Sequence, residues 1–145
     1  MQKKISFIRL GAESADKNSI KVKTYEEIIK EFSESCCKGN LEEIIFDNVI
    51  CLGRPDVFKD LLLIIKPYLS NSGELVICDL GLSMFCDAVC KYFLSDEEAP
   101  KALYGRTHVY NVLEVCLFLE SSGFKIKYKK IDNLSFIIKC SLKDS

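Results

Sequence analysis

The chain has 145 residues, of which 48% are hydrophobic, and its 20 lysines and arginines against 21 aspartates and glutamates leave a formal net charge of −1. This length and hydrophobic content suit one folded domain over residues 1–145 and argue against global disorder. The near-neutral charge gives no electrostatic reason to expect nucleic acid as a partner. No apolar run approaches the ~20 residues that span a bilayer, and no signal-peptide apolar region follows the N-terminal charges. We therefore expect no membrane segment and a location in the cytosol or nucleus, with the cytoplasm favoured.

The first part of the chain predicts two strands and a helix. Residues 4–10 (KISFIRL) form the first strand candidate, and residues 19–23 can give a short second strand. Thr24 and Glu27 make a capping box, in which a hydroxyl caps the helix and a glutamate follows three residues later. The helix is therefore expected to run from 25 to about 37.

The stretch 44–79 organises the rest of the chain. Its two apolar runs, 44–52 and 75–80, lack clean alternation, which is typical of strands buried on both faces. Apolar residues between the runs recur at helical steps, namely Val57, Phe58, Leu61, Leu62, Ile64, Ile65 and Leu69. Strand, helix and strand in this order predict a right-handed βαβ unit of a parallel sheet, with helices covering both faces of that sheet.

The last part of the chain predicts two helices and a hairpin. Helical spacing runs from 83 to 94, and a second helix is expected from a Thr107 cap to about 122. Apolar residues then alternate with lysines from 124 to 128 and with polar residues from 136 to 142. Strands joined by so short a connection must be antiparallel.

Four of these segments resemble class I S-adenosylmethionine-dependent methyltransferases. FDNVICLG at 46–53 resembles the family's fourth-strand signature, and LLLIIKPYLSNSGELVICD at 61–79 resembles its next helix and fifth strand. Residues 107–130 and 134–142 resemble its late helix, Gly-Phe turn and last two strands. The resemblance implies a Rossmann-like α/β methyltransferase fold whose mainly parallel sheet ends in an antiparallel C-terminal hairpin. Residues 16–40 are too few for the family's front half, so the N-terminal half is shortened and lacks one helix and one strand.

The segment FIRLGAESAD at 7–16 follows the outline of the family's glycine-rich cofactor loop. Gly11 stands at the first glycine, but Glu13 and Ala15 replace the next two, and Arg9 replaces the acid at the strand end. Glycines there let the backbone approach the cofactor closely, and no residue clearly takes the place of the acid that binds the ribose. We therefore expect no cofactor. If S-adenosylmethionine does bind, the resemblance assigns the cofactor-binding positions to Gly11, Ala12, Glu13, Leu52 and Gly53.

The chain has eight cysteines, namely Cys36, Cys37, Cys51, Cys78, Cys86, Cys90, Cys116 and Cys140. Most lie within apolar strand or helix patterns, where cysteine behaves as a small hydrophobic residue. We expect Cys51, Cys78, Cys116 and Cys140 to be buried, reduced thiols with no disulfide and no metal, although Cys86 and Cys90 are spaced to share a helix face as two metal ligands. His108, the single histidine, is expected in a first helical turn. As a general base it would need a partner that the sequence does not show, so the catalytic residues are unknown.

Two classes of function fit these features. In the first, a methyltransferase-fold domain has lost its cofactor site and serves as an interaction module for a protein partner. Its compressed front half resembles the N-terminal domain of the anamorsin family of cytosolic iron–sulfur assembly factors, whose cysteine motifs would lie beyond this chain. The alternative is a small S-adenosylmethionine-dependent methyltransferase with a divergent glycine-rich loop, because methyl transfer needs little beyond alignment of the reacting groups. Whether the chain is an enzyme stays open at this point.

Overall fold

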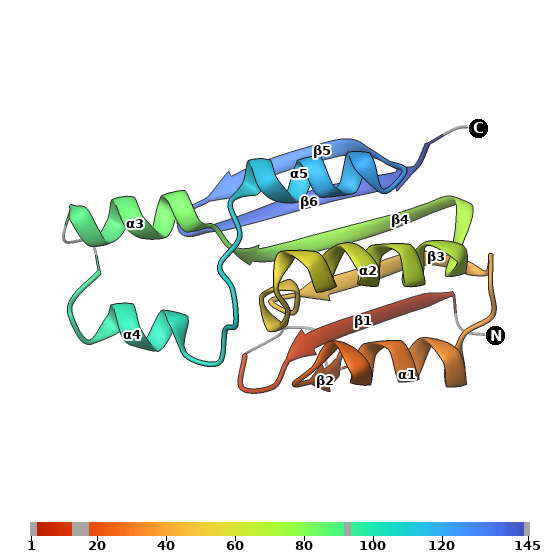
Figure 1. Ribbon diagram of the computed structural model, residues 1–145, viewed down its shortest axis with the longest axis horizontal. Coiled ribbons are helices and arrows are strands. Elements are labelled where there is room, and N and C mark those ends of the chain that lie inside the picture. The colour runs from red at the N-terminus through yellow and green to blue at the C-terminus, as the bar shows by residue number, and fades with distance from the viewer. Residues whose placement is uncertain (1–2, 13–17, 92–93, 144–145) are drawn as a thin grey trace.

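A computed structural model describes residues 3–12, 18–91 and 94–143. Six strands form one sheet in the order β2-β1-β3-β4-β6-β5 (Figure 1). Their bounds are Lys4–Arg9 for β1, Ile20–Val22 for β2, Leu41–Asp47 for β3, Leu69–Leu80 for β4, Phe124–Asp132 for β5 and Ser135–Leu142 for β6. Strands β1 to β4 pair in parallel, and β6 runs antiparallel to both β4 and β5. The predicted α/β fold with a parallel sheet and an antiparallel C-terminal hairpin is confirmed.

Five α-helices and two short 3-10 turns connect the strands within the described residues. They are α1 (Tyr25–Ser35), η1 (Ile50–Leu52), α2 (Pro55–Ile65), η2 (Lys66–Tyr68), α3 (Leu82–Cys90), α4 (Glu98–Leu103) and α5 (Val112–Ser121). The predicted cap of α1 is confirmed, because the Glu27 backbone N–H donates to Thr24 Oγ1 over 3.3 Å. Helix α5 begins later than predicted, since Asn111 rather than Thr107 caps it by accepting from the Leu113 N–H. None of the described helices has the length and hydrophobicity needed to cross a bilayer.

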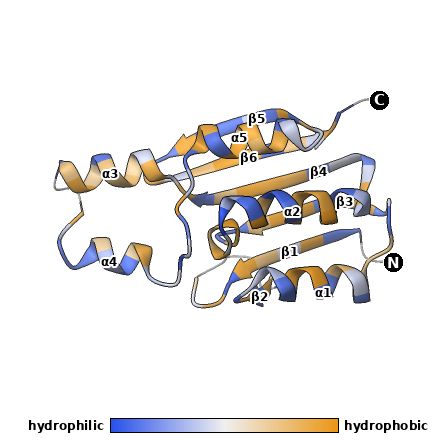
Figure 2. Ribbon diagram, viewed as in Figure 1, coloured by the Kyte–Doolittle hydropathy of each residue, from blue (hydrophilic) through white to orange (hydrophobic). Residues whose placement is uncertain are grey.

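The hydrophobic core lies on one face of the sheet. Helices α1, α2 and α5 lie in front of the strands in the view of Figure 1, and each carries both apolar and polar residues (Figure 2). Alternate strand residues point toward these helices and join their apolar side chains in one buried cluster. These strand residues are Ile5, Phe7, Ile44, Phe46, Leu75, Ile77, Phe136, Ile138 and Cys140.

Chain connectivity explains why the three helices share a face. Helix α1 leads from β2 to β3, α2 leads from β3 to β4, and α5 precedes β5 on the way from β4. Strands β4 and β5 run parallel because each is antiparallel to β6, so all three crossovers move in the same direction across the sheet. Right-handed crossovers in the same direction place their helices on the same face. The step in the opposite direction, from β1 to β2, is made by residues 10–19, fewer than the dozen or more that a helical crossover uses. The predicted loss of a front-half helix therefore leaves the second face without a described helix, and the prediction that helices cover both faces is wrong for the described residues.

The second face, called the uncovered face below, has an apolar centre within a charged border. Ile45, Val76, Cys78 and Ile137 form the centre, as the strand register shows; Val76 is buried and the other three are half-buried. Toward β1 the same face is closed to solvent, because Ser6 and Ile8 are 7% and 1% exposed. The border consists of Lys4, Glu43, Glu74, Lys125, Lys130 and Lys139. This position explains why Cys78 is half-buried rather than buried as predicted, whereas Cys51, Cys116 and Cys140 are buried. All eight cysteines are free thiols.

Two strand boundaries differ from the prediction. Strand β3 ends at Asp47 instead of Leu52, because Asn48 takes a positive φ of 58° and residues 50–52 turn into η1. The second half of that apolar run is therefore a buried turn. Strand β4 begins at Leu69 instead of 75, so the residues inserted relative to the methyltransferase pattern extend the strand.

Two neighbouring isoleucines on β6 test whether the core is one-sided. Ile138 is fully buried in the core, whereas Ile137 is half-buried on the uncovered face. We expect Ile138→Ala to lower the free energy of unfolding by about 2–5 kcal/mol, because it leaves a cavity in a packed core. Ile137→Ala removes the same atoms from a site open to water and should cost less than about half as much. Urea unfolding of the two variants measures the difference, and equal losses would contradict a one-sided core.

Candidate functional site at the strand ends

The carboxyl ends of the parallel strands meet at one edge of the sheet, where open α/β sheets bind their ligands. Arg9 ends β1, Lys23 follows β2, Asp47 ends β3, and Asp79 lies one residue before the end of β4. Residues 98–110, called the lid segment below, begin with α4 and lead to the start of α5. Contacts described next hold this segment against the strand ends.

A buried ion pair joins the lid segment to the sheet. The Arg106 and Asp79 side chains are 8% and 2% exposed, and Nη1 of Arg106 contacts Oδ1 of Asp79. Arg106 also donates from Nη2 to Asn48 Oδ1 over 2.8 Å and from Nε to the Ala102 carbonyl over 2.9 Å. Burial raises the pKa of Asp79, and the Arg106 guanidinium partly offsets that effect. Removing one partner of such a pair leaves the other charge buried without compensation.

Two further contacts hold the lid segment. Nη1 of Arg9 donates to the Tyr104 carbonyl over 2.6 Å. The Cys51 carbonyl accepts from the backbone N–H groups of Thr107 and His108 over 2.7 and 3.1 Å. The lid segment is thus attached to β1, to the η1 turn and to β4, so its position over the strand ends is fixed at several points.

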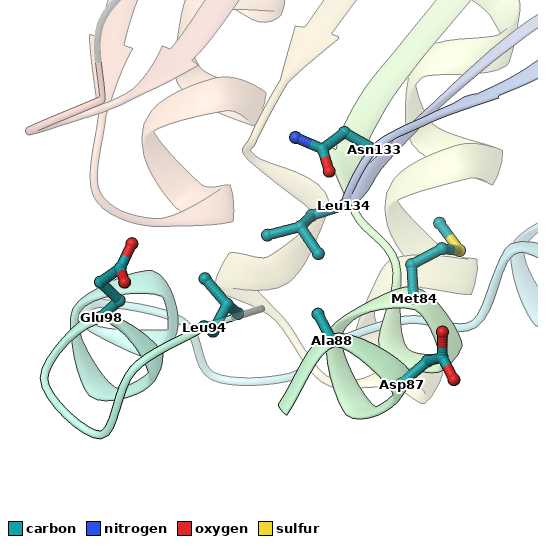
Figure 3. A pocket seen from close by; sticks show the side chains of 7 residues that line it. All are labelled: Met84, Asp87, Ala88, Leu94, Glu98, Asn133 and Leu134. Atoms are coloured by element: carbon teal, nitrogen blue, oxygen red, sulfur yellow. The ribbon is translucent and has the colours of Figure 1, made fainter. Parts of the chain in front are cut away.

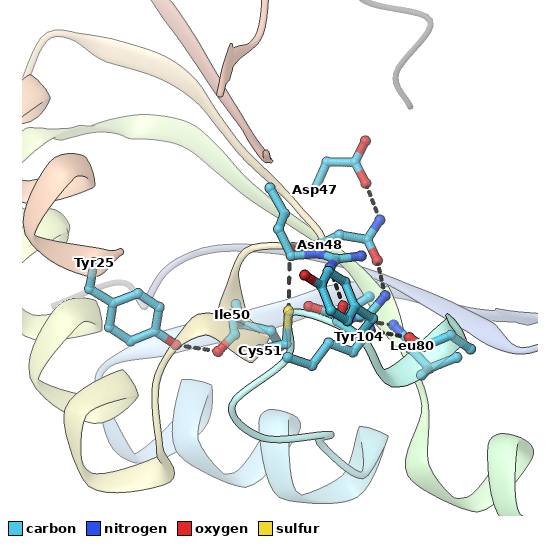
Figure 4. Close-up of polar contacts among 11 residues, drawn as sticks. Tyr25, Asp47, Asn48, Ile50, Cys51, Leu80 and Tyr104 are labelled. Carbon is cyan, nitrogen blue, oxygen red and sulfur yellow. Dashed lines mark hydrogen bonds and ion pairs between the residues drawn. The ribbon is translucent and has the colours of Figure 1, made fainter. Parts of the chain in front are cut away.

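The turn after β3 is braced by two tyrosines. The Tyr25 hydroxyl donates to the Ile50 carbonyl (Figure 4), and the Tyr110 hydroxyl donates to the Gly53 carbonyl over 2.8 Å. Gly53 is buried, and a Cβ there would lie 2.2 Å from a ring carbon of Tyr25. Packing against Tyr25 therefore requires a glycine at position 53, whether or not a ligand binds there.

Asn48 connects several of these groups. Its side chain donates to Asp47 Oδ1 over 2.7 Å and accepts from Arg106, and its carbonyl accepts from the Cys51 thiol over 3.3 Å (Figure 4). Asn48 adopts a positive φ, a conformation that asparagine tolerates better than most residues. Neither Asn48 nor Arg106 belongs to a sequence pattern that predicts a site. The signal that pointed to Arg106 was Asp79 itself, because a carboxylate at the end of a buried strand needs a cation nearby.

A cavity of about 540 Å³ lies at the ends of β1 and β2 and is called the basic cavity below. It is lined by Arg9, Leu10, Gly11, Val22, Lys23, Leu52, Lys101, Tyr104 and Gly105. The structure thus brings Gly11 and Leu52, two of the predicted cofactor positions, to one cavity. Ala12 comes directly after Gly11 in the chain, and its backbone N–H donates to the Arg9 carbonyl over 3.0 Å. Glu13 falls outside the described residues.

A second cavity of about 540 Å³ lies between α3, the start of α4 and the β5–β6 turn (Figure 3). It is lined by Met84, Asp87, Ala88, Leu94, Glu98, Asn133 and Leu134. Its charged lining residues are two carboxylates, and it contains none of the predicted cofactor positions. Nowhere in the described residues do three or more His, Cys, Asp or Glu side chains gather as a metal site would require.

His108 has a partner, Glu114, six residues further along the chain. Its Nε2 lies 3.3 Å from Oε1 of Glu114, and its ring packs edge-on against Tyr110 with centroids 4.4 Å apart. His108 lies before α5 rather than in its first turn, so the expected helical position is wrong. It lines neither of the two cavities, and its contacts therefore support a structural role in holding the lid segment to α5.

Comparison with known proteins identifies the fold. No protein-family model matches the sequence, and no curated protein matches it. Solved structures do match. The PH0226 protein from Pyrococcus horikoshii OT3 aligns with a TM-score of 0.58 and 16% identity over 75% of this chain and 55% of its own. The 1,6-didemethyltoxoflavin-N1-methyltransferase of Burkholderia thailandensis, solved with S-adenosylhomocysteine, aligns with a TM-score of 0.54 and 14% identity over 77% of this chain and 48% of its own.

A third match is magnesium protoporphyrin IX methyltransferase from Synechocystis PCC 6803, also with bound S-adenosylhomocysteine. It aligns with a TM-score of 0.52 and 11% identity over 74% of this chain and 47% of its own. The chain therefore has the class I methyltransferase-like fold, as the sequence resemblance implied. It spans about half the length of these three proteins.

The buried ion pair gives a pH-dependent prediction. In Arg106→Met the carboxylate of Asp79 loses its cation, so its folded-state pKa rises further above the unfolded value. When the folded-state pKa lies above the unfolded value, the free energy of unfolding falls as the pH rises from the unfolded pKa through the folded-state pKa. We expect the variant to lose about 3–5 kcal/mol at neutral pH and less at pH near 5, measured by urea unfolding at both values. The double variant Asp79→Asn, Arg106→Met should lose this pH dependence, and an equal loss at both pH values in the single variant would contradict it.

Thiol reactivity tests the positions of the cysteines. Burial raises the pKa of Cys51 and of Cys140 to about 12, whereas Cys37, Cys86 and Cys90 are exposed. Since the thiolate is the reactive form, the exposed thiols should react with iodoacetamide within minutes at pH 8 and the two buried ones only after unfolding. Peptide mass spectrometry of native and urea-unfolded samples measures this. Rapid native labelling of Cys51 would show that the strand ends are more open than described, and rapid labelling of Cys140 would show the same of the core between the sheet and its helices.

Proposed function

We propose that this chain is a methyltransferase-fold domain that does not hold S-adenosylmethionine and acts as a protein-interaction module. The uncovered face carries this proposal. Parallel sheets occur almost always with both faces covered, because their strands present apolar side chains on both sides. Here four strands are parallel, yet Ile45, Cys78 and Ile137 remain half-buried with no described helix against them. A partner that supplies the second helical layer would remove this apolar surface from water.

The charges of the uncovered face indicate the chemistry of that partner. Glu43 and Glu74 lie over β3 and β4, whereas Lys125, Lys130 and Lys139 lie over β5 and β6. The partner segment that fits is an amphipathic helix with an apolar stripe for the centre and acidic residues toward β5 and β6.

Charge at the strand ends supports the loss of cofactor binding. In the family that the sequence resembles, the first strand ends in an acid and the second strand ends in the acid that binds the ribose. In this chain Arg9 ends β1 and Lys23 follows β2. S-adenosylmethionine carries a positively charged sulfonium, and its ribose hydroxyls donate hydrogen bonds to an acid. Two cations at these positions repel the sulfonium and cannot accept hydrogen bonds from the hydroxyls. We therefore propose that the domain holds no cofactor and binds a protein partner in the cytoplasm. An anamorsin-like role in iron–sulfur protein assembly is its specific form, supported by the sequence resemblance.

The alternative function is a small S-adenosylmethionine-dependent methyltransferase with a divergent loop. One observation favours it: the basic cavity lies at the ends of β1 and β2 and is lined by Gly11 and Leu52, two positions that the resemblance assigned to the cofactor. Aligning a methyl donor and an acceptor there would need no further catalytic group.

Site-specific photo-crosslinking in cells tests the interaction module. A photoreactive residue at Ile137, on the uncovered face, should capture a distinct protein, whereas one at Leu117, exposed on α5, should not. The captured helical segment, made as a peptide, should then bind the purified chain in calorimetry. We expect Ile137→Glu to weaken that binding at least about tenfold, because it places an unpaired charge in an apolar interface, and Leu117→Glu to leave it unchanged. Capture of a second copy of this chain, or equal effects of the two variants, would contradict the proposal.

A further inference from the structure

We propose that the basic cavity binds a small soluble molecule that carries a phosphate group. The charged residues among its described lining are Arg9 from β1, Lys23 after β2 and Lys101 from α4, and none of the lining residues is acidic. Three cations converge here in a chain whose total charge is −1. Glu26 and Glu98, the acids nearest in sequence to Lys23 and Lys101, do not line the cavity, and Glu13 and Asp16 lie outside the described residues.

The cations of the cavity keep unused hydrogen-bonding capacity. Arg9 uses Nη1 to hold the Tyr104 carbonyl, but its Nε is buried and has no hydrogen-bond partner among the described residues. Buried N–H groups are nearly always paired, so a missing acceptor at this wall is informative. Lys23 and Lys101 are exposed and make no ion pair with any described residue. A ligand oxygen could therefore accept from all three without breaking a contact that holds the lid segment.

The kind of anion follows from the number and type of these groups. A carboxylate offers one negative charge. A phosphate monoester offers nearly two negative charges and three acceptor oxygens. Arginine and lysine together are the residues that most often recognise phosphate. The volume of about 540 Å³ lies in the range of small-molecule sites, and the carboxyl ends of parallel strands are where such sites occur. Tyr104, whose side chain is 82% exposed at the cavity, offers a ring on which the rest of the molecule can stack.

This inference goes beyond the proposed function and does not share residues with it. The uncovered face is built from β3, β4, β5, β6 and Lys4, and none of its residues lines the basic cavity. Failure of phosphate binding would therefore leave the interaction module standing, and failure of the interaction module would leave the cavity unaffected.

Calorimetric titration of the purified chain with inorganic pyrophosphate tests the proposal. We expect saturable binding that weakens with added salt, as a site made of exposed cations requires. The variant Lys23→Gln, Lys101→Gln should bind at least about tenfold more weakly. The matched control Lys38→Gln, Lys127→Gln removes the same charge from exposed positions outside the cavity and should bind as the natural chain does. Arg9 is left unchanged because it also holds the lid segment.

A second arm separates the sources of the phosphate. Sedimentation with phosphatidylcholine vesicles, with and without phosphatidic acid, measures attachment to a lipid phosphate, and none is expected because the cavity is a recess and not a basic surface. Absence of pyrophosphate binding, equal weakening in both double variants, binding to phosphatidic acid vesicles alone, or binding of a polyglutamate peptide in place of pyrophosphate would each overturn the proposal. Circular dichroism of the variants shows whether they remain folded.

Discussion

The short connection between β1 and β2 is the constraint on which the rest of the domain depends. Residues 10–19 cannot carry a full crossover helix, so the one step that would place a helix on the second face of the sheet leaves that face uncovered. Helices α1, α2 and α5 belong to connections that put them on the other face, and a single core forms there. Parallel pairing of β1 with β2 places Arg9 opposite Val22 and so brings Arg9 and Lys23 to adjacent strand ends, where they line one cavity.

Charge at the strand ends distinguishes this domain from the methyltransferase pattern that it otherwise follows. Arg9 at the end of β1 reaches the lid segment through the Tyr104 carbonyl, and Arg106 returns from the lid segment to Asp79 and Asn48. Two arginines thus hold together the lid segment and the sheet, where the family resemblance implies a cofactor. A buried ion pair of this kind contributes little net stability compared with an apolar pair in the same place. It fixes the geometry, however, because separating the two groups would leave each charge buried without compensation. We interpret the pair as the reason why the lid segment has a defined position.

The sequence predicted the fold better than the site, for reasons that particular residues make clear. The βαβ unit and the hairpin follow from apolar runs and alternation, which are local signals of packing. The end of β3 was misplaced because Val49, Ile50 and Cys51 are as apolar as a strand, and the positive φ of Asn48 that turns the chain has no apolar signature. The uncovered face was missed because half-buried Ile45 and Ile137 look like core residues in the sequence. Asp79 and Arg106 are 27 residues apart, and no local spacing could show that they meet.

Titration with S-adenosylmethionine, measured by calorimetry on the purified chain, tests the central claim most directly. Arg9 and Lys23 replace the acids that the family resemblance expects, and the account therefore predicts a dissociation constant of roughly millimolar or weaker, or no measurable binding. A dissociation constant in the low micromolar range would contradict the account and favour the methyltransferase.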